Sequence, residues 1–279
     1  MEWGPDSRRA AVSVTFDNLG EAEERQRGAW PEDKPLGRHA SVTEALPWIL
    51  ALLDELDLRA TLFVEGVNAE VYPDALSDIA GSGHEIGYHA WCHEVWGGLE
   101  PDEEWRLLRR GVEAMHERGV ELRGFRPPGG ALTEASPEFL RELGFEYASP
   151  AGQRAGVSDG LALVPFRWQL VDAFFYMEEF EGLREAAGAP ADPLGPRELR
   201  QAVVDGLRRS VERGEHACLL FHPFLSLEEE RRETLRAVLE EVAGLDAWRA
   251  PAGDVAAWML ERPDEVGEPD LTPLPEDSE

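Results

Sequence analysis

Short apolar segments alternate with amphipathic segments along most of the chain, from near its start to about residue 260. Short apolar runs bounded by polar and turn-forming residues are typical of buried strands. Segments with an apolar residue at every third or fourth position are typical of helices that cover a core. The alternation of the two predicts repeated βα units and a parallel sheet rather than a sandwich.

The expected elements can be placed by residue number. Strands are predicted at 10–16, 59–64, 84–88, 122–126, 145–148, 161–166 and 216–221, with 247–250 as a further candidate. Helices are predicted at 41–54, 68–82, 101–118, 136–143, 196–213, 228–242 and 254–261. Such a series without a break in composition indicates one parallel α/β barrel, with its active site at the carboxyl ends of the strands. We therefore expect a single barrel domain over residues 1–262.

Three segments lack this periodicity. Residues 20–39 are polar, with charged residues, Gly and Pro, and we expect a loop or lid over the end of the first strand. Residues 185–196 are rich in Ala, Gly and Pro and predict a surface loop. Residues 263–279 are acidic and Pro-rich with few large apolar side chains, which predicts a disordered tail.

Charge limits the kinds of partner. The 279 residues include 56 acidic and 27 basic residues, a formal net charge of −29. A field of this sign repels phosphate backbones and anionic headgroups, so neither nucleic acid nor a membrane is an expected partner. The first residues do not resemble a secretory signal and no segment has transmembrane length, so we expect a cytoplasmic protein. Cys92 and Cys218, the two cysteines, are expected to stay reduced.

Chemically active side chains occur at the ends of predicted strands. Six of them follow four strands, namely Asp17, Asn18, His89, His93, Arg126 and His222. Because the carboxyl ends of parallel barrel strands form one rim, we expect these groups to meet there. Three tryptophans near the candidates are expected to line the pocket or pack in the core, namely Trp91, Trp96 and Trp168.

His89 and His93 are four residues apart, a spacing at which two imidazoles can share one metal ion, on a helical turn or in a tight loop. With an oxygen ligand from Asn18 or Asp17, they would form a three-ligand site with positions open for water and substrate. A single histidine after a strand is more often a hydrogen-bonded residue than a ligand, and that alternative stays open.

Four further residues have a possible role in proton transfer. Asp17 is placed to take a proton from water held by a metal ion, although an Asp-Asn pair alone is a common turn. Arg126 precedes two prolines and two glycines, and in such a rigid turn it could pair with Asp17; otherwise it is an exposed turn residue. His222 could protonate a departing amine or simply bond to the backbone. Asp172 could raise the pKa of His222 by pairing with it.

In order and spacing, four segments resemble the motifs of the polysaccharide deacetylase family, the NodB-homology carbohydrate esterases. They are TFDN at 15–18, HAWCH at 89–93, RPPG at 126–129 and LFH at 220–222. Residues 60–64 and 83–87 look like the family's second strand and the approach to its histidine motif. The likeness extends from about residue 10 to about residue 260, almost the whole chain.

The resemblance implies a distorted (β/α)7 barrel that binds one divalent ion, usually zinc, and hydrolyses the acyl amide of an N-acetylated sugar. The implied site has three metal ligands, a base, an acid and two orienting residues. These are Asn18, His89 and His93 as ligands, Asp17 as base, His222 as acid, Arg126 beside Asp17 and Asp172 beside His222. The implied partner is a saccharide or small-molecule substrate, and a homo-oligomer is left open.

One departure from the family pattern concerns the metal. The family has two aspartates where this chain has Asp17 and Asn18, so a neutral amide replaces the usual anionic ligand. An amide oxygen attracts a divalent ion less strongly, which predicts weaker binding or a different metal. Three hypotheses follow: a metal-dependent deacetylase or amidase, a metal-independent hydrolase of cyclic imides or ureides, and a catalytically silent carbohydrate-binding barrel.

Overall fold

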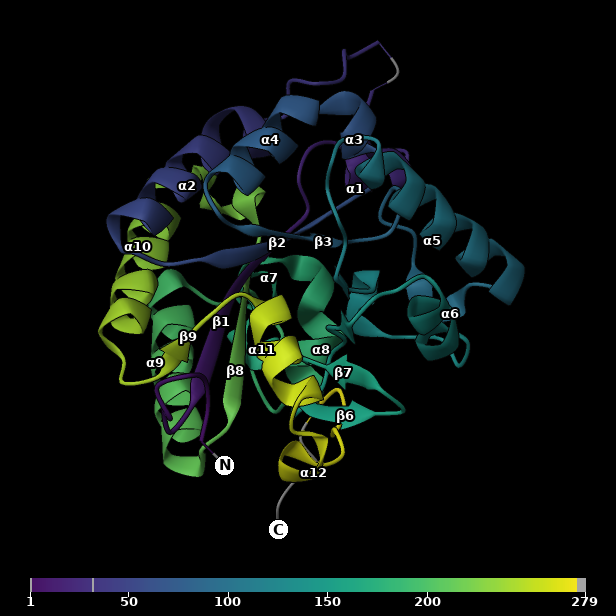
Figure 1. The fold of residues 1–279 in the computed structure, drawn as a ribbon. Helices are drawn as coiled ribbons and strands as arrows, with labels where there is room; N and C mark the ends of the chain where they lie inside the picture. The colour runs from purple at the N-terminus through teal and green to yellow at the C-terminus, as the bar shows by residue number, and fades with distance from the viewer. Residues whose placement is uncertain (1, 32, 275–279) are drawn as a thin grey trace.

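A curled sheet forms the centre of the computed structural model, which describes residues 2–31 and 33–274 (Figure 1). Within these residues the nine-stranded sheet has the order β6-β7-β5-β4-β3-β2-β1-β8, and β9 also pairs with β1. The strands are β1 (Ala11–Asp17), β2 (Ala60–Val64), β3 (Glu85–Tyr88), β4 (Gly124–Phe125), β5 (Tyr147–Ala148), β6 (Gly156–Ser158), β7 (Leu161–Leu163), β8 (His216–Phe221) and β9 (Trp248–Arg249). Each predicted strand overlaps one of them, and β6 is an addition.

Seven strands make the barrel. The pairs β8–β1, β1–β2, β2–β3, β3–β4, β4–β5 and β5–β7 are all parallel. After β7 the chain makes one parallel bridge from Phe166 to Ala151 and another from Val171 to Leu220 of β8. The two edges of the sheet therefore meet through isolated bridges rather than a full ladder. This is the distorted (β/α)7 barrel that the sequence predicted.

Helices cover the outside of the sheet. Figure 1 shows α2, α9 and α10 along one side and α5 with α6 on the other. The covering helices are α2 (Leu46–Glu55), α3 (Asn68–Val71), α4 (Pro73–Gly81), α5 (Pro101–His116), α6 (Ser136–Glu142), α9 (Pro196–Arg213), α10 (Glu229–Gly244) and α11 (Ala252–Leu260). A proline at the first turn of α5 and of α9 fits there without loss of a hydrogen bond, which is why both starts were predicted correctly.

The strands are buried on both faces, as expected for a parallel barrel. All seven residues of β1 and all five of β2 are buried, and apart from the polar Ser13, Thr15, Asp17 and Thr61 they are apolar. Helix α5 packs tightly on β3 at Gly111, where a β-carbon would overlap the Tyr88 ring. The Tyr88 hydroxyl donates a hydrogen bond to the Leu107 carbonyl at 2.8 Å. This packing fixes the end of β3, from which the chain enters the site.

Apart from the turn at residues 41–45, which lies inside the predicted helix 41–54, the remaining short helices occur where the sequence showed no period. In addition to α1 (Ala22–Gln26), η1 (Ser41–Ala45), α7 (Asp172–Tyr176) and α8 (Glu181–Ala186), there are the single turns η2 (Trp96–Gly98), η3 (Pro128–Gly130), η4 (Trp168–Leu170), η5 (Glu178–Phe180) and η6 (Pro223–Leu227). The first of them lies inside the stretch predicted as a loop. Elements of three to six residues cannot show a helical repeat, so pattern alone does not reveal them.

The tail differs from the expected disorder over residues 263–274. Helix α12 (Pro263–Val266) is followed by a bridge between Asp270 and Arg154. The Asp270 carbonyl accepts a hydrogen bond from the Gln153 amide at 2.7 Å. Backbone pairing rather than apolar burial holds this segment, and composition does not report such pairing. Residues 275–279 of the predicted tail lie outside the described residues.

Candidate active site

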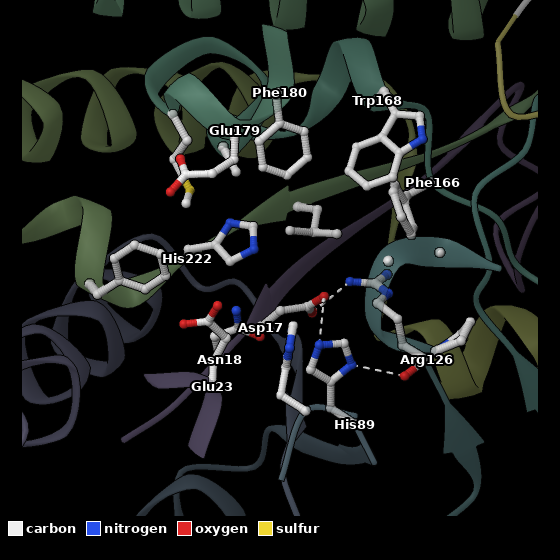
Figure 2. A pocket seen from close by; sticks show the side chains of 18 of the residues that line it. Asp17, Asn18, Glu23, His89, Arg126, Phe166, Trp168, Glu179, Phe180 and His222 are labelled. Carbon is white, nitrogen blue, oxygen red and sulfur yellow. Dashed lines mark hydrogen bonds and ion pairs between the residues drawn. The ribbon is translucent and has the colours of Figure 1, made fainter. Parts of the chain in front are cut away.

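The side chains predicted at the strand ends line one pocket of about 660 Å³ (Figure 2). The six that line it are Asp17, Asn18, His89, His93, Arg126 and His222. They come from the ends of β1, β3, β4 and β8, which point to the same rim because these strands are parallel. The convergence expected from the sequence is therefore present.

Asp17 and Arg126 form a buried ion pair. Arg126 is 0% exposed and Asp17 is 3% exposed. Arg126 Nη1 donates to Asp17 Oδ1 and to Thr15 Oγ1, both at 2.8 Å, while Nη2 donates to Ser149 Oγ at 2.8 Å. Burial raises the pKa of Asp17 above its ordinary value, and the Arg126 guanidinium offsets part of that rise. The guanidinium thus holds the carboxylate in one orientation.

The two histidines share the pocket floor with this pair. The rings of His89 and His93 have centroids 5.0 Å apart. His89 Nδ1 donates to the Arg126 carbonyl at 2.8 Å, and His89 Nε2 lies 3.9 Å from Asp17 Oδ2. A carbonyl can only accept a hydrogen bond, so the neutral His89 ring carries its proton on Nδ1. The lone pair of Nε2 is then available to bind a metal ion. Burial lowers the pKa of His89 to about 3 and that of His93 to about 3.

Three residues that are not glycine adopt left-handed backbone around these side chains. Asn18 has a φ of 63°, Ala90 of 62° and His93 of 65°. Such conformations cost roughly 1–3 kcal/mol each and are concentrated at functional sites in proteins. Both His93 and Asn18 take their direction into the pocket from this backbone. The segment from His89 to His93 is accordingly a tight turn. Of the two geometries that the sequence left open for this pair, a helical turn or a tight loop, the structure has the tight loop.

His222 and Asp172 form a second pair on another side of the pocket. His222 Nδ1 lies 2.6 Å from Asp172 Oδ1, and the His222 amide donates to Asp172 Oδ2 at 2.8 Å. Burial lowers the pKa of His222, but the Asp172 charge and hydrogen bond outweigh it, and the pKa ends above its ordinary value. Asp172 is 2% exposed and begins α7, so it stands behind the imidazole and orients it.

Asn18, His89 and His93 have the chemistry of a metal site. Asn18 Oδ1 is buried and has no hydrogen-bond partner among the described residues. A buried amide oxygen of this kind is costly unless an ion or a water takes its lone pairs. Two neutral imidazoles with one oxygen donor fit a divalent ion such as zinc.

Asn18, the third predicted ligand, is not one of the residue types that usually hold a metal ion, which are His, Cys, Asp and Glu. In residues 2–31 and 33–274 no group of three or more His, Cys, Asp or Glu side chains is arranged to hold a metal ion. The predicted ligand set contains only two such residues, with Asn18 as its third member. The donor set fits, but its charge is lower than that of a carboxylate site.

The pocket walls include residues that sequence reasoning did not assign to the site. Glu23, Glu24 and Arg27 line it from the segment predicted as a loop or lid, and Phe180 lines it from η5. Trp168 also lines the pocket. Trp168 is one of the three tryptophans that the sequence indicated as pocket-lining or core residues. The others follow no strand directly, and no motif marks them; only the position of residues 20–39 after β1 gave a signal.

The other two tryptophans near the candidate residues have different positions. Trp96 is fully buried and donates through Nε1 to Glu104 Oε1 at 3.1 Å, so it belongs to the packing beneath α5. Trp91 lies under the guanidinium of Arg110, 3.5 Å from the ring centroid. Of the three tryptophans, Trp168 is the one that lines the pocket described above.

Fold and site together define an α/β barrel protein with two buried ion pairs and two further histidines at the carboxyl ends of its strands. The family model described as polysaccharide deacetylase matches residues 5–148, just over half of the chain. The chain belongs to the polysaccharide deacetylase family.

Curated relatives are similar over part of their length. Chitin deacetylase 1 of Saccharomyces cerevisiae is 36% identical over 95 residues, which cover 34% of this chain and 32% of the yeast protein. A peptidoglycan-N-acetylglucosamine deacetylase of Bacillus cereus is 31% identical over 103 residues, covering 37% of this chain and 38% of that protein. The chain thus matches about a third of the length of these relatives.

Solved structures are similar over almost the whole chain. A Mycobacterium smegmatis protein, provisionally assigned as a polysaccharide deacetylase, has a TM-score of 0.82 at 29% identity, covering 99% of this chain and 97% of that one. An allantoinase has a TM-score of 0.75 at 16% identity, covering 93% of each chain, and this likeness shows the fold alone. Among the described residues, no helix combines the length and apolar character needed to span a membrane.

Proposed function

We propose that this chain is a hydrolase that removes the acyl group from an N-acylated amine by attack of water on the amide carbonyl. The observation that carries the proposal is the arrangement of two oriented proton-transfer groups in one pocket. Asp17 is held by Arg126, and His222 is held by Asp172. Both Asp17 and His222 line the cavity into which the two histidines also point. Membership of the deacetylase family supports the same reaction.

The chain's own residues supply the proton transfers. Asp17 accepts the proton of the attacking water, and Arg126 favours the ionised form of its carboxylate and holds it in one orientation. His222 gives a proton to the nitrogen of the departing amine, and its raised pKa favours the protonated form that this step needs. Asp172 stabilises the imidazolium form and fixes the ring, as a buried carboxylate does in other acid–base sites.

The proposal includes a divalent ion held by Asn18, His89 and His93, for which zinc is the sequence-based expectation. When bound there, such an ion supplies Lewis-acid polarisation of the carbonyl and charge stabilisation of the oxyanion. The unpartnered Asn18 Oδ1 and the free Nε2 of His89 support this ligand set. A cytoplasmic location stays a prediction from the sequence.

Release of the acyl acid from a panel of amides tests the reaction. We expect purified protein supplied with Zn²⁺ to release acetate from N-acetylated substrates, and Asp17→Asn to lower kcat by at least about 100-fold, the usual contribution of a general base. Asp78→Asn makes the same chemical change at an exposed position of α4 and should leave kcat unaltered. Full activity of Asp17→Asn would rule out its role as the base. Absence of turnover across the panel would favour the silent binding protein.

Metal titration tests the ligand set independently of turnover. Asn18→Asp adds a negative charge at the ligand position and keeps a residue that tolerates left-handed backbone. We expect calorimetry to show Zn²⁺ binding that is tighter by roughly tenfold, or about 1.4 kcal/mol. Asn18→Ala should bind more weakly than the unchanged chain. Equal affinity in all three proteins would place the metal elsewhere.

The same preparations separate the ring-opening alternative. A metal-independent hydrolase of cyclic imides or ureides would retain activity on those rings after chelation and would be indifferent to Asn18→Asp. The allantoinase likeness shows a shared fold and gives no support to that activity.

A further inference from the structure

Two segments outside the barrel strands bound the mouth of the pocket. The first mouth segment is residues 20–31, which contains α1, and the second is residues 166–187, which contains η4, α7, η5 and α8. Side chains from both line the cavity. The catalytic groups of the proposed function lie at the strand ends, and both segments contribute side chains to the pocket that contains Asp17.

The two mouth segments face each other within ion-pair distance. Arg27 Nε lies 2.6 Å from Glu23 Oε1 in the first segment, and Arg27 Nη1 lies 3.8 Å from Glu179 Oε1 in the second. The side chains of Arg27 and Glu179 are 51% and 59% exposed, so this pair is at the rim and contributes little stability. The pair shows that the two mouth segments approach each other. An internal unit of a long polymer can lie in a site only where the groove is open at both ends, so this contact argues against such a substrate.

A buried arginine fixes the shape of the second mouth segment. Arg184 is 0% exposed. Its Nη1 donates to the carbonyls of Phe174 and Met177, both at 2.7 Å, and its Nη2 donates to the Ala191 carbonyl at 2.7 Å. A buried guanidinium must have its donors satisfied, so these backbone acceptors hold the segment in one conformation. The wall that this segment presents is therefore preformed.

That wall is apolar. Figure 2 shows Trp168 and Phe180 across the pocket from Asp17, with Phe166 between Trp168 and Arg126. The ring centroids of Phe166 and Trp168 are 5.0 Å apart and those of Trp168 and Phe180 are 5.4 Å apart. The side chains of Met177 and Leu183 extend this wall. A molecule whose amide reaches Asp17 presents its other end to these rings, which favour an aromatic or other apolar group.

We propose that the pocket takes a single small amide whose amine portion carries an aromatic or other apolar ring, and not an internal unit of a polysaccharide. The inference rests on the proposed function for the identity of the reacting bond. It adds the substrate class, which follows from the facing mouth segments and the aromatic wall.

Chain-length dependence tests the proposal directly. Acetate release would be measured for acetanilide, for N-acetylglucosamine and for its linear oligomers up to the hexamer. We expect kcat/KM to be at least tenfold higher for acetanilide than for the hexamer and not to rise with oligomer length. A rise in kcat/KM with each added sugar would overturn the inference and leave the deacylase function intact.

A matched pair of variants tests the wall. Phe180 and Phe139 are both half-buried, and Phe139 packs on Trp105 at 5.2 Å, outside the pocket. Phe180→Ala should raise KM for acetanilide at least tenfold with little change in kcat, while Phe139→Ala should leave KM unchanged. Equal effects of the two variants on KM would overturn the role of the wall.

Binding keeps the inference testable if no amide is hydrolysed. In calorimetry with the unchanged chain, acetanilide should bind at least tenfold more tightly than the hexamer, and Phe180→Ala should remove that preference. Tighter binding of the hexamer would overturn the inference. Acetanilide binding without hydrolysis of any amide would support the pocket assignment while rejecting the proposed reaction.

Discussion

At the scale of single residues, the proposed chemistry depends on two carboxylates in different environments. Asp17 is paired with the fixed cation of Arg126. Asp172 is paired with the titratable imidazole of His222. An arginine stays charged at all working pH values, so the first pair acts as a permanent clamp, whereas the second pair tunes a group that gains and loses a proton. This difference supports the proposed roles of Asp17 as base and His222 as acid.

Replacing Asp172 should change the pH dependence of the reaction. Burial lowers the pKa of His222 and Asp172 raises it, with a net rise above the ordinary value. A general acid must be protonated, so activity should fall as pH rises through the His222 pKa. Asp172→Asn removes the charge that opposes burial, so the alkaline limb of the kcat/KM profile should move to lower pH.

The control for this prediction is the acidic limb. Asp172→Asn leaves the Asp17–Arg126 pair untouched, so the acidic limb should stay where it is in the unchanged chain. A profile with an unmoved alkaline limb would show that His222 is not the acid.

Residue-level prediction from the sequence succeeded where side chains follow strands. Asp17, His89 and His222 could be located because each directly follows or ends an apolar run. Asp172 was a weak candidate, since one acidic residue among 56 carries little information, and only the fold brings it beside His222. The left-handed backbone at His93 could likewise not be predicted from the sequence pattern, because the turn from His89 to His93 contains no glycine.

At the scale of elements, the docking of α5 on β3 sets the position of the histidine loop. Gly111 faces the Tyr88 ring, and Tyr88 ends β3 immediately before His89. Gly to Ala inside a helix is ordinarily stabilising by up to about 1 kcal/mol. Here the added methyl overlaps a fully buried ring that has no room to move.

Gly111→Ala should therefore destabilise the protein by roughly 1–3 kcal/mol, the usual cost of overpacking a core. Chemical denaturation followed by circular dichroism measures this change in the free energy of unfolding. Gly81→Ala is the matched control, because a β-carbon at Gly81 in α4 meets nothing within 4 Å. A gain in stability for Gly111→Ala equal to that of the control would show that α5 does not pack on Tyr88 this closely.

Long helices were predictable and most short helices were not. Helix α9 begins and ends at the predicted residues because it has a proline at its start and a glycine, Gly214, with a φ of 72° after its end. In contrast, α1 and η5 span five and three residues, too few for a repeat. These short elements form the pocket mouth, so substrate selection was the part least accessible from sequence.

At the scale of the whole molecule, the barrel brings distant parts of the chain to one rim. β1 pairs with β8 over six residue pairs, which sets Asp17 near the strand end that carries His222. The sequence predicted that the strand ends share one rim, but not that β8 lies next to β1; that adjacency follows from the parallel strand order and the closure through residues 166–171. The same closure places Trp168 at the pocket and Asp172 beside His222.

Joint action of Asp17 and His222 is the central claim, and a double-mutant cycle on kcat measures it most directly. Asp17→Asn and His222→Gln should each lower kcat by roughly 100-fold or more, and the double variant should fall no further than the poorer single variant, because residues that act as one unit are not additive. A double variant whose loss equals the product of the two single losses would contradict a shared site.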